Sequence, residues 1–232
     1  MSRFLHMVMG AAVLVLCCVA LPQLSTAQEV TIDSQGRSVT TAPPTASTPS
    51  PQAIEPGSAI PEGTVTIYSN FAPGHSFDPI DAWTESGPAS PVGAVIQAMA
   101  FTPTKATYRL TRIDLAIGWL AGSNGYKLEL RDDNDGQPGQ LIASWGVTRL
   151  PAFGATSSRV DTVRMLSFIT LFRGHQYWLV PIVRSDEWAG WNWNTVSATG
   201  NFAWSTDGGS TWTVAAGTTL GAFDVLGFEV PY

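Results

Sequence analysis

The segment Ile113-Asp114-Leu115-Ala116-Ile117-Gly118-Trp119 decides the fold class. Its odd-numbered residues are large and apolar, while Asp114, Ala116 and Gly118 occupy the positions between them. Successive side chains of a β-strand point to opposite faces, so this period of two predicts a strand with one face in a core. The other face is either solvated or covered by close packing over small residues.

Strand-like runs of the same kind recur along the chain from residue 63 to 232. They are rich in Val, Ile, Tyr, Trp and Thr, and clusters of Gly, Asn, Asp and Pro separate them, as is typical of strands joined by turns. There is no sustained helical periodicity. We therefore predict one all-β domain over residues 63–232, an antiparallel β-sandwich with a jelly-roll-like arrangement as its expected form. The opening segment belongs to a predicted strand over residues 108–119, and the other predicted strands are 64–68, 94–101, 126–131, 141–147, 159–169, 176–183, 201–205 and 223–230.

Residues 1–27 have the features of a secretory signal peptide. Arg3 supplies a positive charge, residues 7–21 form an apolar run, and Ser25-Thr26-Ala27 provides the small residues of a cleavage site. The apolar run is short for a membrane span, although an uncleaved N-terminal anchor stays as the alternative. We expect an exported protein, either secreted, periplasmic or at the cell surface, with no membrane span after cleavage.

Both cysteines, Cys17 and Cys18, fall within this signal. Leu16 precedes Cys17, which fits a lipoprotein cleavage site poorly because that site needs a small residue there. The mature chain would hold no disulfide, so its stability must come from an apolar core. The net charge is −6 and no basic patch is visible, which argues against a nucleic-acid partner.

Residues 28–62 are predicted to be a disordered linker rich in Pro, Ser and Thr. Such a segment cannot bury enough apolar surface to offset the entropy lost on ordering. We expect it to lack regular structure and to be trimmed by proteases, which would leave a resistant core that begins near Thr64.

Six short motifs occur in a particular order along the domain. They are YSNFAPG at 68–74, AMAFTP at 98–103, DNDGQPG at 133–139, QYWLV at 176–180, WAGWNWN at 188–194 and STDGGSTW at 205–212. Together they resemble the bacterial choice-of-anchor β-sandwich domains, most closely the type R variant. The resemblance implies an exported surface domain with an uncharacterised binding role and no known activity. That family carries C-terminal sorting signals, whereas this chain ends Phe228-Glu229-Val230-Pro231-Tyr232, which favours release or retention through an uncleaved signal.

A tryptophan-rich segment is the candidate ligand-binding site. Trp191 and Trp193 share a face if they lie on one strand, and with Trp188 they would offer aromatic rings to the apolar faces of sugars. The amides of Asn192 and Asn194 would bind sugar hydroxyls. We expect Trp191 and Trp193 to be partly exposed, because glycine and asparagine are poor neighbours for a core side chain. Core aromatics are the alternative.

A second candidate is a calcium site, since calcium prefers oxygen ligands. The residues concerned are Asp132, Asp133, Asn134 and Asp135. An EF-hand is excluded because position twelve, counted from the first of them, is Ala143 rather than glutamate. A hairpin turn that uses Asn134 and Gly136 in left-handed conformations is the alternative. No cofactor is required, and calcium is the one that the sequence leaves open.

Residues 205–212 read S-x-D-x-G-x-T-W, which is a single Asp-box hairpin motif. Sialidase propellers repeat this motif, so one copy favours a structural hairpin. Neither a G-x-S-x-G nor an H-E-x-x-H motif is present. We therefore expect no enzyme, although a hydrolase that uses two carboxylates stays as an alternative. Its candidate carboxylates are Asp78, Asp81, Glu85, Asp114 and Glu187.

The sequence thus predicts an exported extracellular or cell-surface interaction module. Its ligand is not identified, and a glycan or a surface protein is the expected kind of partner. The alternatives are a glycan-active hydrolase on a jelly-roll scaffold and a purely structural surface or matrix protein.

Overall fold

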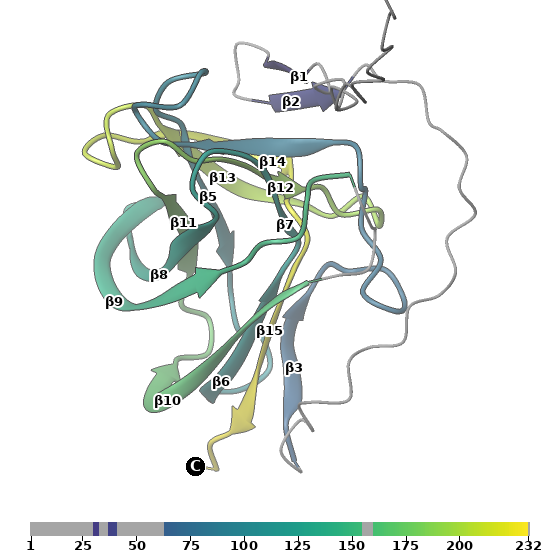
Figure 1. Cartoon of the computed structure of the whole chain (residues 1–232). Coiled ribbons are helices and arrows are strands. Elements are labelled where there is room, and N and C mark those ends of the chain that lie inside the picture. The colour runs from purple at the N-terminus through teal and green to yellow at the C-terminus, as the bar shows by residue number, and fades with distance from the viewer. Residues whose placement is uncertain (1–29, 33–36, 41–62, 155–159, 232) are drawn as a thin grey trace, which may run out of the picture.

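The computed structural model describes residues 30–32, 37–40, 63–154 and 160–231. Within these ranges the chain forms fifteen strands and no helix, and every pair of neighbouring strands is antiparallel (Figure 1). The all-β antiparallel sandwich predicted from the sequence is confirmed. The finer jelly-roll connectivity stays a prediction.

Three sheets make up the fold. The six-stranded sheet has the order β14-β13-β5-β11-β8-β9, with β5 (Ile96–Phe101), β8 (Gly125–Asn134), β9 (Gln137–Thr148), β11 (Tyr177–Val183), β13 (Thr199–Ser205) and β14 (Thr213–Thr219). The four-stranded sheet has the order β10-β6-β15-β3, with β3 (Val65–Ser69), β6 (Tyr108–Leu115), β10 (Asp161–Leu171) and β15 (Phe223–Glu229). The five-stranded sheet has the order β1-β2-β4-β12-β7, with β1 (Val30–Ile32), β2 (Arg37–Thr40), β4 (Ala82–Ser86), β7 (Ile117–Ala121) and β12 (Trp188–Asn192).

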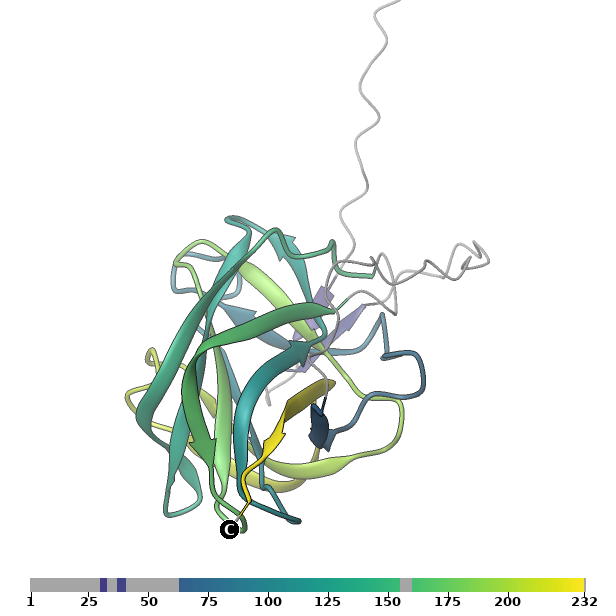
Figure 2. The same cartoon turned by 90° about the horizontal axis from the view of Figure 1, so that it is seen from below.

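A single large apolar core lies among the three sheets, and Figure 2 shows the strands curving around this common interior. The six-stranded sheet contributes Met99 and Leu128, the four-stranded sheet contributes Ile113 and Val225, and the five-stranded sheet contributes Trp191. All five side chains are fully buried. A chain without a disulfide in its domain can depend on such a core, because burial of apolar surface is the main favourable term in folding.

The segment 113–119 passes from one sheet to another. Strand β6 ends at Leu115 and β7 begins at Ile117, so Ala116 is the corner between the four-stranded and five-stranded sheets. Ile113, Leu115 and Ile117 enter the core as predicted. Asp114 and Ala116, at the intervening positions, are also fully buried. The second face of this segment is therefore covered by packing and is not solvated.

Part of the linker prediction is wrong. Strands β1 and β2 lie within residues 28–62, and β2 pairs with the edge of β4 through Arg37 opposite Trp83 and Ser38 opposite Ala82. An otherwise unpaired strand edge offers backbone hydrogen bonds that a short extended segment can use. The rest of the linker and the predicted signal peptide lie outside the described residues. Within the described ranges, no helix is long and apolar enough to cross a membrane.

Candidate functional site

The tryptophan-rich segment does not form an exposed platform. Trp191 is completely buried in the main core, and its Nε1 donates a hydrogen bond to the carbonyl oxygen of Ala222 at 3.1 Å. Trp193 is half-buried and packs on the same core, with its ring 5.7 Å from that of Trp83. The two side chains do share a face, but this face is the interior. The prediction that Trp191 is partly exposed is therefore wrong.

The two asparagines of the segment bind the backbone rather than solvent. Asn192 Nδ2 donates to the carbonyl oxygen of Asp78 at 2.8 Å. Asn194 Nδ2 donates to the carbonyl oxygens of Ala198 and Leu220, and its Oδ1 accepts from two backbone amides of the following turn. Both side chains are buried. With Trp191, Asn192 and Asn194 inside the fold, the segment including the half-buried Trp188 offers no continuous surface for a sugar.

The acidic run after Leu130 forms the hairpin turn between β8 and β9. Asp133 Oδ1 accepts from Gln176 Nε2 and Trp178 Nε1 at 2.6 and 2.8 Å, and its Oδ2 accepts from the amide of Gly136. Partial burial acts to raise the pKa of Asp133, but these hydrogen bonds outweigh it and hold the pKa below its usual value. This carboxylate is therefore already engaged by its own turn and by residues at and just before the beginning of β11.

The remaining residues of the run point to the turn interpretation as well. Asp135 and Gly136 have left-handed φ angles of 52° and 82°, so Asp135, not Asn134, takes the first left-handed position. Asp132 Oδ1 lies 2.5 Å from His175 Nε2. Among the described residues, the carboxylates of Asp132, Asp133 and Asp135 are not brought together as a metal-ligand group.

These contacts yield a first prediction. Replacing Asp133 with alanine should lower the free energy of unfolding by about 1–3 kcal/mol, since it leaves the buried indole N–H of Trp178 without its acceptor. Calcium should not shift the melting temperature of the unmodified protein. Denaturant titration and calorimetry with and without calcium measure the two effects, and Asp135→Asn is the control variant. If calcium raised the melting temperature of the parent protein but not that of Asp133→Ala, the calcium-site hypothesis would be supported after all.

The single Asp-box is a self-contained turn between β13 and β14. Asp207 Oδ1 accepts from the Ser205 hydroxyl and from the amides of Ser210 and Thr211, and its Oδ2 accepts from the Thr211 hydroxyl at 2.6 Å. The hydrogen bonds from Thr211 and Ser205 hold the pKa of Asp207 well below its usual range. The carboxylate is thus committed to the turn, which agrees with the structural interpretation of the motif.

The carboxylates considered for a hydrolase are mostly inside the fold. Glu85, Asp114 and Glu187 are each completely buried. Burial raises the pKa of Glu85 well above its usual value, against a hydrogen bond from the amide of Gln97 that lowers it. None of the three lines the open groove described next. Hydrolysis by a carboxylate pair requires access to a bulky substrate, and these positions do not provide it.

An open groove follows the edge strand β9, with one hollow towards β10 and a second towards β8 and β11. One hollow of about 530 Å³ is bounded by residues 144–148 of β9 and 162–164 of β10. A second hollow of about 460 Å³ lies on the other side of residues 144–148, towards β8 and β11. Trp145 lines both hollows and is half-buried, because part of its ring packs on the main core.

The walls of the groove combine unpaired strand edges with positive charge. Strands β9 and β10 each end their sheet in the described fold, so one side of each carries backbone N–H and C=O groups that no ladder uses. The exposed basic residues Lys127, Arg164 and Arg184 line the two hollows, and no acidic residue does. This contrasts with the net charge of −6 for the whole chain.

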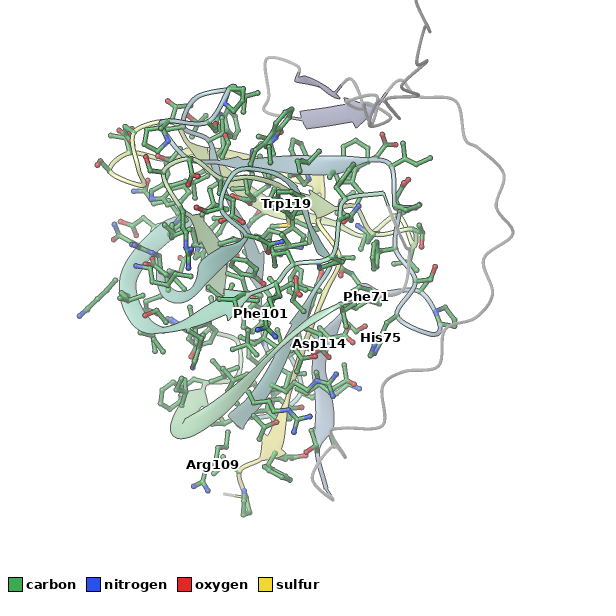
Figure 3. All side chains as sticks on the ribbon, viewed as in Figure 1. Phe71, His75, Phe101, Arg109, Asp114 and Trp119 are labelled. Carbon is green, nitrogen blue, oxygen red and sulfur yellow. The ribbon has the colours of Figure 1, made fainter. Side chains whose placement is uncertain are left out.

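A cluster of one histidine and two aspartates, which the sequence analysis did not predict, lies on the outer face of the four-stranded sheet. A ring nitrogen of His75 and one oxygen each of Asp114 and Asp224 all lie within 4.8 Å of one another. Figure 3 shows His75 on its loop beside Asp114. The only signal in the sequence was the acidic residue at an alternate position of the 113–119 strand, which did not reveal its two partners.

The chain was compared with protein-family models, with curated proteins and with solved structures, and none of the three comparisons found a match. The resemblance to choice-of-anchor domains therefore stays a prediction. Support for a function comes from the geometry of the groove and of the buried side chains.

Proposed function

We propose that this protein is an exported interaction module that binds an extended, acidic polypeptide segment of another surface protein in the groove along β9. The observation that carries the proposal is the edge strand β9, which forms one wall of that groove. Extended segments bind such edges by continuing the hydrogen-bond ladder, while side-chain pockets along the strand supply specificity.

The half of β9 that lines the groove lacks the usual protection against pairing. Natural edge strands are short or carry charges, bulges or prolines that block the approach of another chain. Strand β9 has twelve residues, none of which is charged, and its proline, Pro138, lies near its beginning. Its two register irregularities against β8 fall within residues 138–143, so residues 144–148, which line the groove, form a regular edge. Leu141 and Ile142 expose 44% and 41% of their surface, so the strand presents apolar side chains as well as free backbone groups.

The rim of the groove favours an acidic partner. Arg164 and Arg184 are both exposed, and neither has an acidic neighbour among the residues that line the hollows. Complementary charge steers a partner to its site and opposes the binding of like-charged ones. Trp145 offers an aromatic surface in the middle of the strand, where a partner side chain would bury it further.

A peptide-display selection on the full chain tests this function. We expect the enriched peptides to be extended in character and acidic. The double variant Arg164→Glu/Arg184→Glu should bind these peptides about tenfold or more weakly, equivalent to about 1.4 kcal/mol or more of binding free energy, because like charges would then face each other. Both side chains are exposed, so the folded state should be little affected. Arg173→Glu, at an exposed arginine that does not line the groove, is the matched control.

Two outcomes would contradict the proposal. One is a failure to enrich any peptide whose binding depends on Arg164 and Arg184. The other is a glycan array in which a sugar binds the parent protein, does not bind Trp145→Ala, and binds the charge-reversed variant as strongly as the parent. That second outcome would assign the groove to a glycan instead.

A further inference from the structure

Two buried carboxylates face each other across neighbouring strands. Asp114 on β6 and Asp224 on β15 are direct register partners, and their side chains expose only 1% and 8% of their surface. Like charges directly opposite each other destabilise an antiparallel pair, and burial strengthens the repulsion. This arrangement therefore requires positive charge between or beside the two groups, and Arg112 supplies one such charge through its ion pair with Asp114.

Each carboxylate keeps one oxygen without a partner. Asp114 Oδ1 accepts from Arg112 Nε at 2.8 Å and from the Thr162 hydroxyl at 2.7 Å, whereas Asp114 Oδ2 and Asp224 Oδ1 are buried and accept no hydrogen bond among the described residues. A buried acceptor left unsatisfied costs free energy. Metal-binding carboxylates are commonly held in this way, with hydrogen bonds on one oxygen that orient the other towards the ion.

The loop between β3 and β4 places an imidazole over the pair. Asn70 fixes the beginning of the loop, since its Nδ2 donates to the carbonyl oxygen of Gly221 and its Oδ1 accepts from the amide of Phe223. The loop turns back at Gly74 and His75, which have φ angles of 75° and 57°. His75 Nε2 then lies 3.3 Å from Asp224 Oδ2, with 37% of its side chain exposed (Figure 3).

The apolar surroundings of this loop complete the enclosure. The ring of Phe71 lies 5.3 Å from that of His75, and Phe71, Phe77, Ala116 and Ala222 form a small buried cluster of their own. The other end of the loop is held by the hydrogen bond from Asn192 described above. The carboxylates are therefore shielded from water, and the partly exposed imidazole is the ligand of the cluster that solvent reaches most.

The geometry points to a binding site for a divalent transition-metal ion, with Zn²⁺ as the ion of choice, formed by His75, Asp114 and Asp224. Zinc accepts imidazole nitrogen together with carboxylate oxygen, whereas calcium and magnesium prefer oxygen ligands alone. Bound there, the ion would connect the β3–β4 loop to β6 and β15 and compensate the two facing carboxylates. The three ligands lie on other elements than β9 and β10, and the only shared residue is Thr162, which borders the groove and donates to Asp114. The inference does not depend on the function proposed for the groove.

Equilibrium dialysis of the tag-free, metal-stripped full chain against Zn²⁺ tests the inference. We expect one zinc ion per chain, a raised melting temperature in the presence of zinc, and no comparable effect of calcium. His75→Gln and Asp224→Asn should each weaken zinc binding by about tenfold or more. The matched control is His175→Gln, which removes the histidine of a more exposed His–Asp pair that has no comparable cluster.

Substitution by Co²⁺ in the unaltered protein provides a measurement that needs no variant. Visible absorption typical of cobalt bound to nitrogen and oxygen ligands should appear and be abolished by added zinc. Failure of the unaltered chain to bind either ion would show that the cluster is an ion-pair network only. Zinc binding that is equally strong in His75→Gln and Asp224→Asn would place the ion elsewhere and overturn the assignment.

Discussion

Replacing Trp191 with alanine is expected to lower the free energy of unfolding by about 3–5 kcal/mol, the range found for buried aromatic truncations. The side chain has no exposed surface, its ring lies 5.9 Å from that of Phe223, and its Nε1 donates to Ala222. The ring also packs flat against Gly221, where an added Cβ would lie 2.5 Å from the nearest indole carbon. Denaturant titration measures the loss.

Two variants separate this interpretation from the alternative of an exposed, ligand-binding Trp191. Trp193→Ala should cost less, since that side chain is only half-buried. Gly221→Ala should destabilise by about 1–3 kcal/mol, because the new methyl group would collide with the indole ring. A Trp191→Ala protein that is as stable as the parent would contradict the buried position and revive the sugar-binding hypothesis for this segment.

The prediction of an exposed Trp191 was wrong because it judged the neighbours of the residue by local sequence alone. Glycine is in general a poor core neighbour, yet a Cβ at Gly190 would lie 2.7 Å from the ring of Phe153, so this glycine makes room for an aromatic side chain. Asn192 and Asn194 use their amides on backbone groups of distant segments. Such complementarity between remote parts of a chain leaves no local signal.

Most of the strands could be predicted, because alternation of apolar residues depends only on the geometry of extended backbone. Strands β4, β12 and β14 are absent from the prediction, and β4 and β12 are buried along nearly their whole length, so they lack such an alternation. The sheet to which each strand belongs could not be predicted. The corner at Ala116 depends on a hydrogen bond from its amide to Ala222 and on one from the amide of Asn192 to its carbonyl oxygen. These partners lie far along the chain, and their positions follow from tertiary packing.

Both candidate sites have the same origin. The groove exists because β9 and β10 both end their sheets, which is a property of strand order and not of either segment. The proposed zinc site exists because the register of β6 and β15 sets Asp114 opposite Asp224. A shift of one residue in that register would turn one carboxylate to the opposite face. The sequence therefore shows which residues could be ligands, but it does not show that they lie close together.

Trp178 provides the second large expected effect, on the opposite face of the six-stranded sheet from the main core. The side chain of Trp178 is fully buried. It is the largest member of a separate cluster, whose other buried residues are Ile96, Ala98, Ala100, Val180 and Ala203. Because its neighbours include three alanines, little can move in to fill the space that Trp178→Ala would leave. We expect a loss of about 3–5 kcal/mol in the free energy of unfolding, measured by denaturant titration.

The hydrogen bond from Trp178 Nε1 to Asp133 Oδ1 makes this prediction separable into packing and polar parts. Trp178→Phe keeps much of the aromatic volume and removes the N–H, so it should cost clearly less than Trp178→Ala. The double variant Trp178→Ala/Asp133→Ala should lose less free energy of unfolding than the sum of the losses of the two single variants, since both single changes break the same bond. Strict additivity would show that the bond contributes nothing to stability. A small loss in Trp178→Ala would show that the outer face of the sheet is not packed as the structure has it.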